Sequence, residues 1–280
     1  MAQVKLKIRY KWLLLLGLSF QLLAFGGVTV NPKHLVFDSS RKTVALTVRN
    51  TASGDYEAWV EVKFGYSVSD DSGKAGIVYD SLAVGEYSAA EWIKPYPQRF
   101  LLPPGESQTI RLVAYPPLEL KEGEYWARVN LTFKPRKATI NPKSTVNVSG
   151  GITFIQSIGI PAYFRQGKVT TGVQLTNLEA TASKKEVVCT MNLERLGTGA
   201  YLGVRTFRLM NNKGEQVANS ISNVSIFKKN LVRYVFDRAA IPAGQYTLEV
   251  EVVSGKRTDI DRKLALSAPA VRSSVSVVLP

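Results

Sequence analysis

Residues 98–133 read QRFLLPPGESQTIRLVAYPPLELKEGEYWARVNLTF, and this stretch decides the fold. A Pro-Pro-Gly turn at 103–105 leads into residues 107–114, where polar and apolar side chains alternate. Alternation is cleaner in residues 125–133, because every second side chain from Ala127 to Phe133 is apolar. The pattern predicts two strands of an immunoglobulin-like sandwich, each with one buried face.

The rest of the chain repeats this pattern. Short segments rich in β-branched and aromatic residues lie between clusters of Gly, Pro, Asn and Asp, and no long stretch has a helical period, which predicts an all-β fold. The expected strands are residues 28–30, 35–37, 43–50, 57–67, 100–102, 107–114, 125–134 and 151–163, and then 170–178, 185–195, 203–210, 220–226, 232–237, 244–253 and 262–268. Residues 270–280 also alternate and are expected to form either the last strand or a mobile tail.

The first 27 residues have the build of a signal peptide. Four basic residues within positions 5–11 precede an apolar run at 12–25, and Ala24 and Gly26 suggest cleavage after Gly26. The run is short for a membrane span of ~20 residues, so cleavage is favoured over an uncleaved anchor. The expected organisation is a signal peptide at 1–27, a first domain at 28–166 and a second domain at 167–280.

Composition limits the possible functions. The chain has 280 residues, of which 45% are apolar, enough for two sandwich cores after the leader is removed. Loss of the leader's four basic residues lowers the formal charge from +14 to +10. For an exported protein this charge points to acidic proteins, wall polymers or lipid headgroups as partners and not to nucleic acid. Most of the Lys and Arg side chains are expected only to keep the surface solvated.

No chemistry is visible in the sequence. The single histidine, His34, has no accompanying nucleophile signature, and the single cysteine, Cys189, lies in an alternating run where a buried thiol is expected. One His and one Cys in separate domains cannot form a zinc site, and the acidic pairs at 70–71 and 259–261 are expected to be solvated turns. The sequence therefore predicts a protein that is not an enzyme and that has no metal or cofactor.

Three stretches resemble a known family. They are VNPKHLVFDSSRKTVALTVRNT at 30–51, the proline-turn strand pair at 103–114, and GITFIQSIGIPAYFRQG at 151–167. Together they resemble the PapD-like periplasmic pilus-assembly chaperones of the chaperone-usher type, as a divergent member. The resemblance implies two immunoglobulin-like domains in a boomerang arrangement and a location in the periplasm. It also implies that the chain caps pilus, fimbrial or surface-fibre subunits and delivers them to an outer-membrane usher.

In that family the last strand of the first domain is lent to the subunit, which lacks a strand of its own. The resemblance assigns subunit binding to Ile152, Phe154, Gln156 and Ile158. Apolar side chains recur at every second position here, interrupted only by Gln156, as a donor strand at a sheet edge requires. A core strand has the same pattern, and we expect Ile152 and Phe154 to serve as donors while residues 158–164 face their own core.

Family members also hold the carboxylate at the subunit's C-terminus with an arginine and a lysine in the cleft between the domains. His34 stands at the arginine's position here and Pro161 at the lysine's. The remaining cations close in sequence are Lys33 and Arg165, so Lys33, His34 and Arg165 are the candidate carboxylate anchors.

A second interpretation is a structural or adhesive cell-surface protein with tandem immunoglobulin-like domains. It requires exposed aromatic side chains on one face, and it requires that the strand at 151–163 be covered on both edges. The aromatic residues in question are Tyr87, Trp92, Tyr96 and Trp126.

Overall fold

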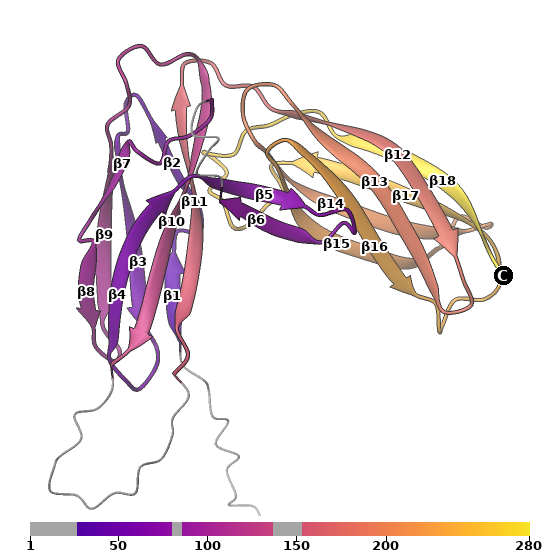
Figure 1. Ribbon diagram of the computed structural model, residues 1–280. Coiled ribbons are helices and arrows are strands. Elements are labelled where there is room, and N and C mark those ends of the chain that lie inside the picture. The colour runs from indigo at the N-terminus through magenta and orange to yellow at the C-terminus, as the bar shows by residue number, and fades with distance from the viewer. Residues whose placement is uncertain (1–26, 80–85, 137–152) are drawn as a thin grey trace, which may run out of the picture.

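The computed structural model describes residues 27–79, 86–136 and 153–280, and in these ranges the chain forms strands and turns without a helix (Figure 1). The expected signal peptide, except Gly27, and Ile152 lie outside the described residues. Figure 1 shows two sandwiches in sequence order, set at an angle to each other.

The first sandwich has two sheets. One has the order β1-β3-β9-β7, and the other the order β2-β11-β10-β4-β8. Their strands are β1 (Val28–Asn31), β2 (Leu35–Asp38), β3 (Thr43–Asn50), β4 (Tyr56–Lys63), β7 (Ile93–Tyr96), β8 (Arg99–Leu102), β9 (Ser107–Ala114), β10 (Gly123–Pro135) and β11 (Gln156–Gln166). The predicted alternation in β10 is confirmed, because Ala127, Val129, Leu131 and Phe133 all lie in the core between the sheets.

The second sandwich also has two sheets, with the orders β12-β13-β16 and β15-β14-β17-β18. Its strands are β12 (Gly172–Ala182), β13 (Glu186–Leu196), β14 (Tyr201–Asn211), β15 (Gln216–Ile226), β16 (Lys229–Asp237), β17 (Gly244–Ser254) and β18 (Val271–Leu279). Cys189 is a free, buried thiol in this core, as expected. The final segment is strand β18, which settles the choice between strand and tail.

A hairpin joins the two sandwiches. Strands β5 (Gly65–Ser69) and β6 (Ala75–Tyr79) pair only with each other, and they leave the first domain to reach the edge of the second beside β15 and β16 (Figure 1). At its base, the hydroxyl of Tyr79 donates to Asn130 Oδ1 on β10 at 2.9 Å. The hairpin is therefore a bridge that belongs to neither sandwich.

An apolar cluster fills the junction between the domains. From the first domain it takes Val36, Trp126 and Tyr163 together with Phe64 and Tyr66 from the start of the hairpin, and from the second Ala200, Leu202, Phe227 and Ile260. Rings meet in several orientations here, including a stacked pair of Tyr163 and Phe227 with centroids 6.2 Å apart. Such packing stabilises one relative position of the two domains.

Two strand predictions were wrong, and two strands were missed. The single strand expected at 57–67 is two strands, β4 and β5, which belong to different sheets and meet at Phe64 and Gly65. Residues 262–268 form no strand. They begin with a turn, in which the carbonyl of Asp261 accepts hydrogen bonds from the backbone N–H groups of Leu264 and Ala265. Strands β6 and β7 were not anticipated, since β6 is short and β7 contains Pro95, which is tolerated there because β7 lies at the edge of its sheet.

Candidate binding edge and interdomain cleft

Strand β11 has one free edge over half its length. On one side it pairs with β10 from Gln156 to Gln166, but on the other side the parallel strand β2 covers only residues 162–165. In the part of the chain that the structure describes, no strand pairs with the second side of residues 156–161. Unpaired backbone N–H and C=O groups along such an edge are able to accept a strand from another protein.

The side chains assigned to the donor strand fall into two groups. Ile158 lies opposite Leu131 of β10, which places it on the core face, and it packs against the core of the first domain. The side chain of Gln156 is turned toward β1, where its Oε1 accepts from the backbone N–H of Val28 at 3.3 Å. Both side chains are thus held by contacts within the first domain and are not available to insert into another protein.

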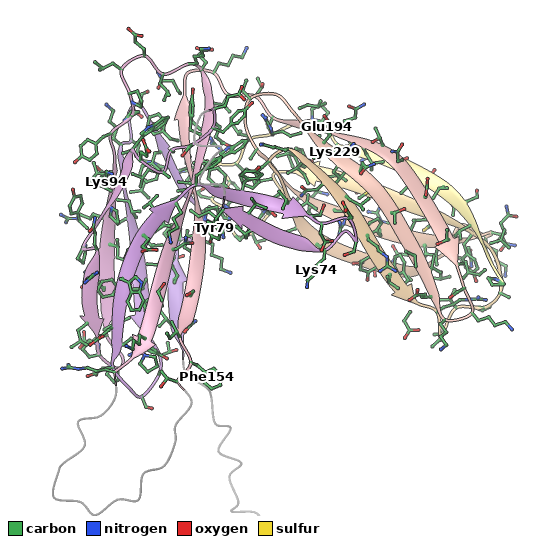
Figure 2. The ribbon with its side chains drawn as sticks, in the orientation of Figure 1. Lys74, Tyr79, Lys94, Phe154, Glu194 and Lys229 are labelled. Atoms are coloured by element: carbon green, nitrogen blue, oxygen red, sulfur yellow. The ribbon has the colours of Figure 1, made fainter. Side chains whose placement is uncertain are left out.

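Phe154 differs from these two. It precedes β11, its side chain is 80% exposed, and it points away from the sandwich at the lower end of the strand (Figure 2). Ile155 beside it is 56% exposed. Two large apolar side chains are therefore presented next to the free edge, and burying each in a partner would contribute about 1.5–3 kcal/mol.

Arg165 and Glu124 form a buried ion pair at the other end of β11. Arg165 Nε donates to Glu124 Oε2 at 2.8 Å, and the Glu124 side chain is only 1% exposed. Glu124 Oε1 also accepts from the indole N–H of Trp126 at 3.1 Å and from the backbone N–H of Ala200 at 2.9 Å. Arg165 is thus engaged within the protein and ties the first domain to the second, which leaves it unsuited to anchor a ligand.

His34 belongs to a second polar cluster across the junction. Its ring nitrogens lie 3.2 Å from the hydroxyl of Tyr163 and 3.3 Å from Asp259 Oδ2, and Arg257 holds the same carboxylate through two hydrogen bonds. Lys33, the neighbouring candidate, is exposed at the surface. Of the three expected anchors, two are therefore bound by internal partners and one lies outside the buried cluster.

Stability is expected to fall as the pH decreases from 7 to 5 because of His34. Burial, and then the charge of Arg257, lower the pKa of His34 below 6.5, and Asp259 does not compensate for this. The unfolded chain therefore takes up a proton near pH 6.5, before the folded chain does, and acid favours unfolding in that window. Arg257 also holds the pKa of Asp259 below 3.8, so the protonation of Asp259 lowers the stability of the fold only in stronger acid.

His34→Gln should reduce the change in the free energy of unfolding between pH 7 and pH 5, as measured by urea unfolding at several pH values. Lys33→Gln is the matched control and should keep the wild-type slope. An unchanged slope in the His34 variant would show that another group is responsible.

Sequence reasoning missed Arg128. This cation is on β10, directly opposite Pro161 of β11. Its Nη2 donates to the carbonyl of Gly159 at 2.7 Å, while its Nε is buried without a hydrogen-bond partner. Arg128 takes part in no ion pair with any acidic residue in the described ranges. The alternation at 125–133 placed Arg128 on the outer face, but only the folded chain places that face beside the free edge of β11.

The aromatic residues of the adhesive interpretation do not form an exposed cluster. Trp126 is fully buried at the junction, where Tyr87 stacks on it at 4.8 Å and Arg195 lies over both rings. Trp92 packs against Tyr125 and Phe164 in the first domain. Tyr96 of β7 is 53% exposed, but the other three do not extend it into an exposed cluster. Within the described ranges neither condition of that interpretation is met, since no strand there covers the second side of residues 156–161.

The ranges 27–79, 86–136 and 153–280 contain neither a metal-binding cluster nor a membrane-spanning helix. No group of three or more His, Cys, Asp and Glu side chains is placed to hold a metal ion, and no helix there is long and apolar enough to cross a membrane. In the acidic turn at 70–71, the side chain of Asp70 binds the backbone of the turn itself, since its Oδ1 accepts from the backbone N–H groups of Ser72 and Lys74.

Comparison with known proteins gives similarities of fold alone. No family model matches the sequence, and no curated protein matches it. Among solved structures, the YadV chaperone is 10% identical with a TM-score of 0.47, covering 88% of this chain and 99% of that one. The CsuC–CsuE chaperone–tip adhesion subunit complex of Acinetobacter baumannii has 12% identity, a TM-score of 0.44 and coverages of 91% and 99%. The Pseudomonas aeruginosa CupB2 chaperone has 13% identity, a TM-score of 0.42 and coverages of 89% and 98%.

The two tandem all-β sandwiches that the resemblance to PapD-like chaperones implied are present in the described residues, so the expected fold class is confirmed.

Proposed function

We propose that this protein is a chaperone that caps an incomplete β-sandwich subunit of a pilus or surface fibre by lending it the free edge of β11. The observation that carries the proposal is the half-covered strand itself, open along residues 156–161 and preceded by the exposed side chains of Phe154 and Ile155. Main-chain hydrogen bonds would supply affinity along the edge, and the two apolar side chains would enter the groove of the subunit. Export to the periplasm and delivery to an outer-membrane usher are part of the same proposal.

The client is expected to be a protein with an exposed apolar groove and a free strand edge. An isolated edge strand pairs readily with any partner that offers unpaired backbone groups, so a chaperone that holds such a client also protects it from aggregation. The core-facing side chains of β11 pack in the core of the first domain. Only the side chains before Gln156 are therefore available to enter the groove of the client.

Capture of the client is the test of this proposal. The protein is to be isolated from a periplasmic extract of its own organism and its complexes examined by native mass spectrometry. Phe154→Asp should remove a one-to-one complex with a small exported β-protein, because a carboxylate cannot be buried in an apolar groove without a partner. Leu118→Asp is the matched control, since Leu118 is a fully exposed apolar residue in the loop between β9 and β10 and its replacement should leave capture intact.

Hydrogen exchange shows where the client binds. In the complex, the amides of residues 153–161 should exchange more slowly than in the free protein, whereas those of the covered segment 162–165 should change little. A client that binds Phe154→Asp as well as the wild type, with no added protection at 153–161, would refute the proposed role of β11.

Arg128 is the candidate that we propose for holding the client's C-terminal carboxylate. Its guanidinium lies beside the free edge and takes part in no ion pair with the described acidic residues. A charge-assisted hydrogen bond contributes ~1.5–3 kcal/mol, so Arg128→Gln should weaken binding of the identified client by about 10- to 100-fold.

Amidation of the client's C-terminus should weaken binding to the wild-type protein by a similar factor, and it should have little further effect on the Arg128 variant. Additive losses from the two changes, measured by titration calorimetry, would assign the carboxylate to another residue. Lys33→Gln provides the comparison with the anchor that the sequence suggested.

A further inference from the structure

The bridging hairpin packs closely on the edge of the second domain. Gly73 at its tip has a φ of 78°, and a Cβ added there would lie 2.6 Å from the backbone N of Arg233 on β16. Figure 2 shows the neighbouring Lys74 beside the second sandwich, far from the first. Because β15 and β16 are edge strands of the two facing sheets, the hairpin covers an open side of the second sandwich.

A cavity of about 250 Å³ lies under the hairpin. Its walls come from β5 and the hairpin tip on one side and from β14, β15 and β16 on the other, and two arginines, Arg205 and Arg233, line it. None of the described residues that line this cavity is acidic, so its local charge is positive.

Arg205 lies on the inner face of β14, in line with the core residue Phe207. Its guanidinium carbon lies 4.8 Å from the centroid of the Phe207 ring, and its Nη2 donates to Ser222 Oγ at 2.9 Å. Burial lowers the pKa of Arg205, and no carboxylate among the described residues forms an ion pair with it. Burial also raises the pKa of the nearby Cys189 to about 12, so this thiol is neutral at pH 7 and supplies no counter-charge.

Other polar groups in the cavity also lack partners. Five buried side-chain polar atoms in the described residues have no hydrogen bond, and three of them belong to residues that line this cavity: Arg205 Nε, Ser69 Oγ and Asn230 Oδ1. Each such group costs free energy when it is left without a partner. Two of the three, Arg205 Nε and Ser69 Oγ, carry a proton to donate, and their position beside an uncompensated cation favours an anionic ligand.

We propose that this cavity binds a small oxyanion, such as phosphate, sulfate or a small carboxylate. Arg205 supplies the charge, Arg233 adds a second cation, and the hydroxyl of Ser69 donates from the hairpin. An anion held in this way joins the bridging hairpin, which extends from the first domain, to the second domain. The ligand therefore pins the two domains in one relative position, independently of any client at β11.

Thermal unfolding of the full mature chain tests the proposal. Sodium phosphate, sulfate and acetate are each titrated against sodium chloride at equal ionic strength, so that general salt effects cancel. An anion that binds only the folded protein should raise Tm by about 3–5 °C at ten times its Kd. Arg205→Gln should lose this shift, and without the anion its Tm should be equal to or higher than that of the wild type, because an uncompensated buried charge has been removed.

Arg208→Gln is the matched control. Arg208 lies on the same strand but pairs with Glu251 at 3.2 Å, outside the cavity, so its replacement should leave the anion shift unchanged. Hydrogen exchange should show slower exchange at residues 69–75 when phosphate or the most effective anion is added to the wild type.

Three outcomes would overturn the proposal. The first is a wild-type Tm that does not respond to any of the three anions relative to chloride. The second is an Arg205→Gln protein that is less stable in every buffer and keeps the full anion response, which would mean that Arg205 is a structural residue and the anion binds elsewhere. The third is an anion shift that disappears equally in the Arg208 control.

Discussion

Replacing Arg165 with methionine is expected to lower the free energy of unfolding by about 3–5 kcal/mol. The substitution keeps much of the apolar volume of the side chain but leaves the carboxylate of Glu124, which is 1% exposed, without a counter-ion. Water cannot reach this carboxylate to replace the lost partner. The two hydrogen bonds that remain, from Trp126 and Ala200, do not neutralise its charge.

The size of this effect depends on the unpaired charge and not on the ion pair itself. Glu124→Gln combined with Arg165→Met removes both charges while an amide oxygen still accepts from Trp126 and Ala200. The double variant should therefore recover most of the lost stability, since a buried pair contributes little compared with neutral groups of similar shape. Arg272→Met is a control, because Arg272 also pairs with a glutamate, Glu251, but at the surface, where a cost below about 1 kcal/mol is expected.

Urea unfolding followed by tryptophan fluorescence and circular dichroism measures these differences. Two probes are needed, because a two-domain chain does not always unfold in one step. A loss below about 1 kcal/mol in Arg165→Met would show that Glu124 is solvated, contrary to its position in the structure.

Trp126→Ala is expected to destabilise the protein by about 3–5 kcal/mol. Trp126 is fully buried, stacks with Tyr87 and meets Phe227 of the second domain edge-on at 5.0 Å. Its removal leaves a large cavity at the junction and takes the indole donor from Glu124. Because the cluster joins the domains, we also expect the single unfolding transition to separate into two.

Tyr115→Ala is the comparison for this variant. Tyr115 is 60% exposed in the loop after β9, so its loss should change stability by no more than about 0.5 kcal/mol. A Trp126→Ala protein that unfolds in one step, with a loss close to that of Tyr115→Ala, would mean that the junction does not couple the domains.

These two predictions concern the same feature, which is a rigid junction built from polar and aromatic groups together. Glu124 accepts from Ala200 across the domains, and Arg165 Nη1 donates to the carbonyl of Leu264 at 2.6 Å. A fixed angle between the domains would present the free edge of β11 and Arg128 in one geometry. A preorganised site of this kind loses less entropy when a client binds.

The strands that alternate most clearly could be predicted from the sequence. The expected strands 43–50 and 107–114 coincide with β3 and β9, because each has one buried face and turn residues at its ends. The row of apolar residues around Phe154 was also visible, and in the structure Ile158 of this row packs against the core of the first domain.

Other features depended on contacts between residues distant in sequence. Nothing in the alternation of 151–163 indicates that β2 stops after four residues and leaves the edge of β11 open. The anchors proposed from sequence, His34 and Arg165, are engaged because Asp259 and Glu124 reach them from other segments.

Local periodicity thus determined the fold class and the faces of the main strands, because the alternation of a strand depends only on neighbouring residues. The candidate donor segment was implied by the family resemblance. The tertiary structure alone decided which edge is open, which cations lack partners and where the hairpin of β5 and β6 lies. Those properties depend on which strands and side chains meet across the junction, and the residues concerned, such as Gly73 and Arg233, are separated by more than half of the chain.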